Sequence, residues 1–197
     1  MKTKELLFTY WKELYPNEPQ DQLNRFLEDL EIIRDKNTKS NETDWYKDAV
    51  VYSLYVDLFN KDFNGLIEKL DYLQDLGVGG LWLLPVHPSP TYHKYDVEDY
   101  QGIHKDYGSL DDYRELVKQA HERDMIILID LVANHSSNRH PWFEKAVAGD
   151  KKYRNYYVWS DDPEDFANNQ WQWHEVRDSE GNKLEGEKYY GLFWWEM

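Results

Sequence analysis

The stretch Asp130-Leu131-Val132-Ala133-Asn134-His135 directly follows the apolar run Met125-Ile126-Ile127-Leu128-Ile129. A short apolar run of this kind predicts a buried β-strand. Asp130, Asn134 and His135 would then lie at the carboxyl end of that strand and in the loop after it. In parallel α/β folds the carboxyl ends of the strands carry the ligand-binding side chains. Polar groups held there need hydrogen-bond partners, so this stretch predicts a polar binding site.

Composition narrows the class of protein. The chain has 197 residues, a net charge of −15 and no cysteine, so we expect neither disulfide bonds nor a cysteine-based metal site. A strongly acidic protein repels phosphate backbones, which excludes nucleic acid as an expected partner. The N-terminal apolar run is too short for a secretory signal, and no segment reaches the ~20 apolar residues of a membrane span. We therefore expect a cytoplasmic protein that does not bind membranes.

The first 36 residues predict a pair of helices. Apolar residues recur at helical spacing on both sides of Pro16-Asn17-Glu18-Pro19, which separates the two helices. Residues 36–43 form a polar linker without apolar periodicity. We expect a helical hairpin that packs its apolar stripe on another surface.

From residue 49 onward, apolar strands alternate with amphipathic helices, which predicts an α/β fold with a parallel sheet. An open doubly wound sheet and a closed barrel both fit this alternation. No glycine-rich loop follows a strand, which counts against a nucleotide-binding version. The expected elements are a strand over 49–58, a helix over 64–76 stopped by Gly77, a strand over 78–84, a helix capped by Ser109 and a strand over 125–132.

Beyond these elements the regular pattern is lost. Residues 136–197 are expected to be loop-like and rich in aromatic side chains, with a hairpin turn at 178–182. The loop over 85–96 combines Tyr92 and Tyr95 with histidine, proline and Asp96. Aromatic rings stack on sugar rings while acids and amides bind sugar hydroxyls, so this mixture is compatible with a sugar site. From composition alone, a proline-stiffened surface loop is the better interpretation.

The order of several motifs along the chain favours the sugar site over the surface loop. Together the motifs resemble the first third of the barrel of the α-amylase family of glycoside hydrolases and transglycosylases, over about residues 45–197. Asp130, Asn134 and His135 form the strongest single match. The motifs are, in order, Trp45 to Tyr52, Gly77 to Pro85, Lys94-Tyr95-Asp96, Tyr100, Tyr107-Gly108 and Asp130…Asn134-His135.

The resemblance implies an α/β fold, a partial TIM (β/α)8 barrel made of the first three β/α units. It further implies a domain-B-like insertion after strand three, and an N-terminal helical hairpin precedes the barrel. The expected domains are residues 1–44 for the hairpin and linker, 45–135 for the barrel portion and 136–197 for the start of the insertion.

The resemblance also implies roles for individual residues. Tyr95 resembles the tyrosine that stacks on the sugar at the cleavage subsite, and His135 the histidine that binds an outer hydroxyl of that sugar. Asp96 is a further expected substrate-binding residue. Asp130 resembles an aspartate that supports the active site. Asn134 resembles an asparagine that ligates a structural calcium in many members, although calcium needs six to eight oxygens and the others are not named by the sequence.

Two departures from the family pattern bear on specificity. Many exo-acting members and trehalose synthases carry an aspartate three residues before the stacking tyrosine, where this chain has Tyr92. A strict single-glucose-releasing enzyme is therefore disfavoured against an amylase-like or transferring one. The segment 60–64 lacks the aspartate-rich calcium loop of some members, so we expect no metal there.

The expected function is that of a retaining enzyme acting on α-linked glucose oligosaccharides or polysaccharides. Retention needs two carboxyl groups about 5–5.5 Å apart. None of the 38 acidic residues lies in a matching motif, and Asp96 with Asp130 is a poor replacement pair. We therefore expect an N-terminal fragment that is inactive alone, with no catalytic residue in this chain.

Three alternatives stay open. The chain could be a non-catalytic carbohydrate-binding module, or belong to a glycosyl-transferring member such as a trehalose synthase-like enzyme. A zinc hydrolase is weakly supported, because His135 and His140 lack the intervening glutamate of the His-Glu-x-x-His motif.

Overall fold

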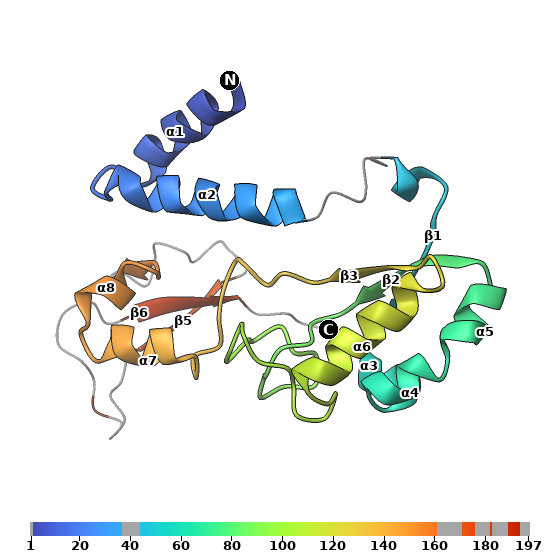
Figure 1. Cartoon of the computed structure of the whole chain (residues 1–197). Helices are drawn as coiled ribbons and strands as arrows, with labels where there is room; N and C mark the ends of the chain where they lie inside the picture. The colour runs from blue at the N-terminus through green and yellow to red at the C-terminus, as the bar shows by residue number, and fades with distance from the viewer. Residues whose placement is uncertain (1, 37–43, 161–170, 176–181, 183–188, 194–197) are drawn as a thin grey trace. The chain divides into compact units, whose positions relative to one another are not determined.

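The computed structural model of the protein describes residues 2–36, 44–160, 171–175, 182 and 189–193 (Figure 1). The chain divides into two compact units, Met1–Asp48 and Ala49–Met197. The predicted boundary between the hairpin with its linker and the barrel portion lies nearby, between residues 44 and 45.

The first unit contains the two predicted helices. Helix α1 spans Lys2–Leu14 and α2 spans Gln20–Lys36, followed by a short 3-10 helix, η1, at Trp45–Lys47. Within this unit Lys4 Nζ lies 2.6 Å from Glu31 Oε1, which joins α1 to α2. Leu23 is buried, whereas most of the other apolar side chains of the two helices are exposed.

The second unit is built on a parallel sheet of three strands. Strand β1 spans Val50–Leu54, β2 spans Val78–Leu83 and β3 spans Ile126–Ile129, in the order β1-β2-β3. The strands follow one another in chain order without the reversal of a doubly wound sheet, which favours the barrel alternative. Strand β1 is shorter than predicted, because a helix already begins at Val56.

The connections between the strands are helical. Helix α3 spans Val56–Asn60, α4 spans Phe63–Ile67, α5 spans Leu70–Asp75 and α6 spans Leu110–His121. The single helix predicted over 64–76 is therefore wrong, because the chain breaks between α4 and α5. The predicted cap is confirmed: Ser109 and Asp112 form a capping box at the start of α6.

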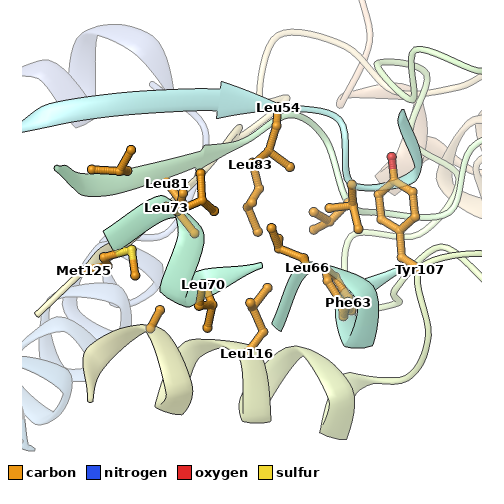
Figure 2. Close-up of a cluster of buried hydrophobic side chains, with 14 residues drawn as sticks. Leu54, Phe63, Leu66, Leu70, Leu73, Leu81, Leu83, Tyr107, Leu116 and Met125 are labelled. Atoms are coloured by element: carbon orange, nitrogen blue, oxygen red, sulfur yellow. The ribbon is translucent and has the colours of Figure 1, made fainter. Parts of the chain in front are cut away.

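The hydrophobic core lies on one face of the sheet, between the strands and helices α4, α5 and α6 (Figure 2). Side chains alternate along a strand, so Leu81 and Leu83 of β2 share this face and are fully buried. The other core members labelled in Figure 2 are Leu54, Phe63, Leu66, Leu70, Leu73, Tyr107, Leu116 and Met125.

The opposite face of the sheet is exposed among the described residues. Strand pairing aligns Ser53 with Trp82 and Trp82 with Leu128, so these three side chains lie on the same, exposed face of the sheet. Trp82 is 44% exposed and Val51, paired with Gly80, is 42% exposed. In a closed barrel this face would be the interior.

The region after β3 is more regular than predicted. It contains α7 at Pro141–Val147, α8 at Lys151–Arg154, and an antiparallel sheet of β4 at Trp159–Ser160, β5 at Trp171–Glu175 and β6 at Tyr189–Phe193, in the order β4-β6-β5. The loop-like prediction for 136–197 is wrong at these elements, because His140 and Asp150 cap the two short helices. The predicted turn at 178–182 lies outside the described residues except for Asn182.

Candidate functional site

Asp130 is the centre of the candidate site. It follows Ile129 of β3 and therefore points to the exposed face of the sheet, together with Trp82. Its Oδ1 accepts a hydrogen bond of 2.6 Å from Trp82 Nε1, and its Oδ2 accepts one of 2.6 Å from the Tyr95 hydroxyl. Burial and the neighbouring Asp130 carboxylate raise the pKa of Tyr95, so this hydroxyl keeps its hydrogen and donates.

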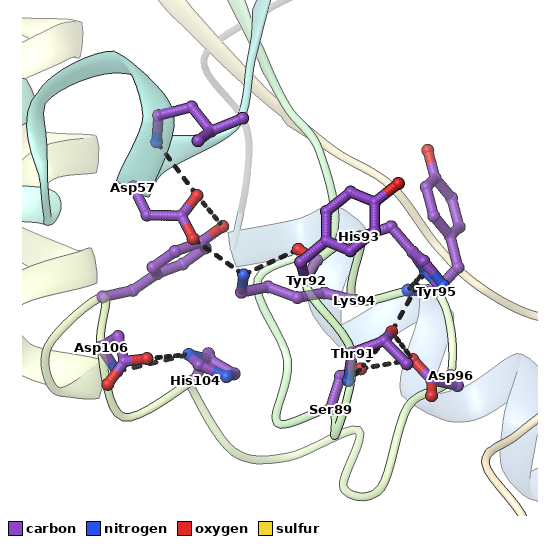
Figure 3. A network of polar contacts seen from close by, with 12 residues as sticks. Asp57, Ser89, Thr91, Tyr92, His93, Lys94, Tyr95, Asp96, His104 and Asp106 are labelled. Atoms are coloured by element: carbon purple, nitrogen blue, oxygen red, sulfur yellow. Dashed lines mark hydrogen bonds and ion pairs between the residues drawn. The ribbon is translucent and has the colours of Figure 1, made fainter. Parts of the chain in front are cut away.

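Tyr95 lies in the long loop after β2, and its backbone is also held. Its N–H donates to His93 Nδ1 over 3.1 Å, and the two rings lie 6.0 Å apart between centroids (Figure 3). Tyr95 is half-buried, which leaves part of its side chain available to a ligand.

His135 lies directly beside Tyr95. Its Nε2 is 3.0 Å from the Tyr95 carbonyl oxygen. A carbonyl only accepts, so Nε2 carries the hydrogen. Burial lowers the pKa of His135, which favours the neutral ring with an unprotonated Nδ1, 3.4 Å from Asn134 Nδ2. The predicted pair Tyr95 and His135 is thus brought together.

Tyr100 holds the loop that carries His135. Its hydroxyl lies 2.8 Å from the Val132 carbonyl and 2.7 Å from the His135 carbonyl, so one hydrogen is shared between two acceptors. Burial raises the pKa of Tyr100 to about 12. Its ring stacks on Trp142 of α7 at 5.8 Å, which links the loop to the region after β3.

Asp96 accepts hydrogen bonds from two residues of its own loop. Its Oδ1 accepts a 2.5 Å hydrogen bond from Ser89 Oγ and another from Thr91 Oγ1 (Figure 3). Its charge acts on His135, where it partly opposes the lowering of the pKa. Asp96 therefore lies near the Tyr95–His135 pair, and its predicted role as a sugar ligand stays a prediction.

The described residues do not form a metal site. Nowhere in the described part of the chain do three or more His, Asp or Glu side chains gather in a way that could hold a metal ion. Asn134 is exposed and by itself supplies one of the oxygens that calcium needs. His140 is buried and its Nδ1 accepts the Trp142 N–H at the start of α7, which is a structural role. The predicted calcium stays a prediction.

Sequence reasoning missed three residues of this site. Trp82 lies in an apolar strand, where its indole N–H gives no signal in a hydropathy pattern. His93 and Tyr100 act through the backbone of the loops that they hold, and although Tyr100 is one of the matched motifs, the motif order assigned it no role. The strand register could have found Trp82, because it places Trp82 opposite Leu128 and on the side of Asp130.

The comparisons with known proteins decide the family. The family description "Alpha amylase, catalytic domain" matches residues 30–185. This chain belongs to the alpha-amylase family. It is 42% identical over 161 residues to alpha-amylase 3 of Dictyoglomus thermophilum, covering 78% of this chain and 30% of that protein. It is 37% identical over 171 residues to oligo-1,6-glucosidase of Bacillus cereus, covering 78% of this chain and 31% of that protein.

Solved structures of the alpha-amylase family agree with the fold. The trehalulose synthase MutB from Pseudomonas mesoacidophila superposes with a TM-score of 0.61 at 33% identity, over 76% of this chain and 28% of that one. The three-stranded parallel sheet thus corresponds to part of an alpha-amylase family barrel. The chain spans less than a third of each of these three relatives. Among the described residues, no helix has the length and apolar character needed to cross a membrane.

Proposed function

We propose that this chain forms one wall of the sugar-binding site of a glycoside hydrolase-like enzyme that acts on α-linked glucose oligosaccharides or polysaccharides. The observation that carries the proposal is the 3.0 Å contact of His135 Nε2 with the Tyr95 carbonyl, beside a Tyr95 hydroxyl anchored on Asp130. The relatives support a carbohydrate substrate, since they include an oligo-1,6-glucosidase and a trehalose-6-phosphate hydrolase.

The chemistry of the three residues fits sugar binding. The half-buried ring of Tyr95 offers a surface on which a pyranose ring can stack. A His135 ring nitrogen can form a hydrogen bond with a hydroxyl of the same sugar. Asp130 fixes the tyrosine ring through its hydroxyl, so the ring is oriented before the sugar arrives. Orientation in advance lowers the entropy lost on binding.

Bond cleavage in this proposal needs residues that we do not assign in this chain. A retaining mechanism uses a nucleophilic carboxylate and an acid/base carboxyl about 5–5.5 Å apart. Hydrolysis and glycosyl transfer share the covalent intermediate and differ in the acceptor, which is water or another sugar. Tyr92, which is 61% exposed and lies three residues before Tyr95, supports an amylase-like or transferring specificity over strict release of single glucose units.

The direct test is an assay of the protein encoded by the whole gene on maltose, starch and sucrose, with product analysis. We expect turnover of at least one substrate and its loss in Tyr95→Ala and His135→Ala. Tyr72→Ala is the matched control, because Tyr72 is 57% exposed on α5. Wild-type rates in both site variants would contradict the assignment of the site.

A non-catalytic carbohydrate-binding module is the second candidate. It is favoured by the absence of a recognisable catalytic carboxylate motif among the 38 acidic residues. One experiment on the protein encoded by the whole gene distinguishes the two candidates. An enzyme turns over its sugar, whereas a binding module binds maltose in calorimetry and forms no product.

A further inference from the structure

We propose that Lys94 is a positioning residue, whose buried ammonium group anchors the loop that presents Tyr95 to the sugar. This inference rests on the proposed function for its link to sugar binding. The geometry itself involves Lys94 and Asp57, which Figure 3 shows, together with Tyr107. None of the three belongs to the site described above.

The backbone of Lys94 is the first observation. Its φ is +61°, in the left-handed region that glycine adopts without steric cost. Lys61, with φ +72°, is a useful comparison, because its side chain is 88% exposed and its ion pair with Asp62 lies on the surface. Lys94 is instead only 2% exposed. A buried side chain therefore accompanies a strained backbone here.

The contacts of the Lys94 ammonium are the second observation. Nζ lies 3.0 Å from Asp57 Oδ2 and 3.0 Å from the Tyr92 carbonyl oxygen, to both of which it donates. It also lies 4.8 Å from the centre of the Tyr107 ring, in a cation–π contact. The Tyr107 hydroxyl donates to Asp57 Oδ1 over 3.0 Å, so both carboxylate oxygens have partners. The buried ammonium group of Lys94 thus has the hydrogen-bond and charge partners that a buried cation needs.

The charge of Asp57 fits the same arrangement. Partial burial alone would raise the pKa of Asp57, but the hydrogen bonds from Lys94 and Tyr107 outweigh it and lower the pKa. Asp57 thus stays ionised at neutral pH and holds the ammonium group. It lies in the first turn of α3, directly after β1.

The position of this anchor in the chain gives it a consequence for Tyr95. Lys94 directly precedes Tyr95, and its ammonium group binds the carbonyl oxygen of Tyr92. This hydrogen bond fixes the backbone between Tyr92 and Tyr95. Tyr95 then reaches Asp130 after β3. The anchor therefore joins the end of β1, the loop after β2 and the end of β3, and fixes where the Tyr95 ring lies.

The test compares Lys94→Gly with Lys61→Gly. Both variants place glycine at a position of positive φ, but only the first removes a buried anchor. The first readout is the indole N–H resonance of Trp82, assigned with Trp82→Phe, because Trp82 and Tyr95 share Asp130. We expect this resonance to move in Lys94→Gly and to stay in Lys61→Gly.

The second readout is maltose turnover by the protein encoded by the whole gene. We expect kcat/KM to fall about tenfold to a hundredfold in Lys94→Gly, the effect of a misplaced binding group, and to be unchanged in Lys61→Gly. Lys94→Met, which removes the ammonium group with its charge and its hydrogen bonds but keeps an unbranched side chain, decides the question if Lys94→Gly does not fold. A lower melting temperature with an unmoved Trp82 resonance and wild-type kcat/KM in Lys94→Gly and Lys94→Met would overturn the proposal. If the unsubstituted protein does not turn over maltose, the proposed function is at fault, and the Trp82 resonance alone tests the anchor.

Discussion

At the residue scale, the site depends on one carboxylate that organises two neighbours. Asp130 accepts from Trp82 and Tyr95 with separate oxygens, each over 2.6 Å. Hydrogen bonds to an ionised carboxylate are stronger than neutral ones. The orientation of the Tyr95 ring therefore depends on a single carboxylate, which directly follows β3.

Removing the Tyr95 hydroxyl tests that dependence. Tyr95→Phe keeps the aromatic ring but loses the hydrogen bond to Asp130, which we expect to lower kcat/KM on the sugar substrate roughly tenfold to a hundredfold, because such bonds contribute about 1.5–3 kcal/mol. Steady-state kinetics measures the change. Tyr72→Phe, at an exposed position of α5, should leave the kinetics unchanged. Equal activity of Tyr95→Phe and the wild type would show that Asp130 does not orient the ring.

His135 makes the folding stability of the molecule depend on pH, and the direction of its pKa shift fixes the sign of that dependence. Burial lowers its pKa below the ordinary value of 6.5, so the unfolded chain binds a proton more readily than the folded protein. Its stabilising contribution is present above pH 6.5 and is lost as the pH falls below that value. His104 and His140 shift in the same direction.

We therefore expect the melting temperature to fall as pH decreases from 6.5, and to fall less steeply in His135→Gln. Thermal melts across this range measure the difference, and NMR titration of His135 should give a midpoint below 6.5. A midpoint above that value would contradict the burial of the ring beside Tyr95.

How far the sequence predicts the site differs between residues. Tyr95, Asp130 and His135 follow from motif order, because the motifs place them at the ends of neighbouring strands, and the structure brings them together. Lys94 and Trp82 lie within the matched motifs, but their roles were not predicted, because these arise from contacts with residues distant in the chain. A hydropathy pattern contains no information on such contacts.

At the element scale, the sheet has one packed face and one exposed face. Leu81 and Leu83 of β2 are fully buried against the helices, whereas Trp82 between them is 44% exposed. The three parallel strands were predicted at the right places because apolar runs are strong signals, although β1 and β3 are shorter than predicted. The break between α4 and α5 was not predicted, because the apolar spacing continues through it, and α7 and α8 are too short to show a helical period.

The packed face should determine the stability of the second unit. Leu81→Ala would leave a cavity between β2 and the helices and should lower the free energy of unfolding by about 2–5 kcal/mol. Leu58→Ala on α3 is the matched control, because Leu58 is 78% exposed and its loss should cost about 0.5 kcal/mol or less. Denaturant unfolding measures both. Equal effects of the two substitutions would contradict the assignment of the core to this face.

At the scale of the whole molecule, the chain belongs to the alpha-amylase family, and its described parallel sheet has unpaired edges. The described strands β1 and β3 each pair with β2 only. Val51 and Trp82 are exposed on the face opposite the core, and Leu131 is 76% exposed just after β3. Exposed apolar surface and free strand edges favour association with other chains.

We therefore expect the 197-residue chain, produced alone, to be poorly soluble or to self-associate. Size-exclusion chromatography with light scattering at several concentrations measures this. Trp82→Ser should reduce association, because it removes apolar surface from the exposed face. A monodisperse monomer that melts cooperatively would show that this surface is covered within the chain itself.

In the proposed site, Tyr95 and His135 contact one sugar ring from neighbouring parts of the sheet edge. A crystal structure of the protein encoded by the whole gene, with bound maltose, tests it most directly. We expect a glucose ring stacked on Tyr95, with one hydroxyl about 3 Å from a His135 ring nitrogen and the Tyr95 hydroxyl still bonded to Asp130. Maltose bound elsewhere, with neither ring in contact, would contradict it.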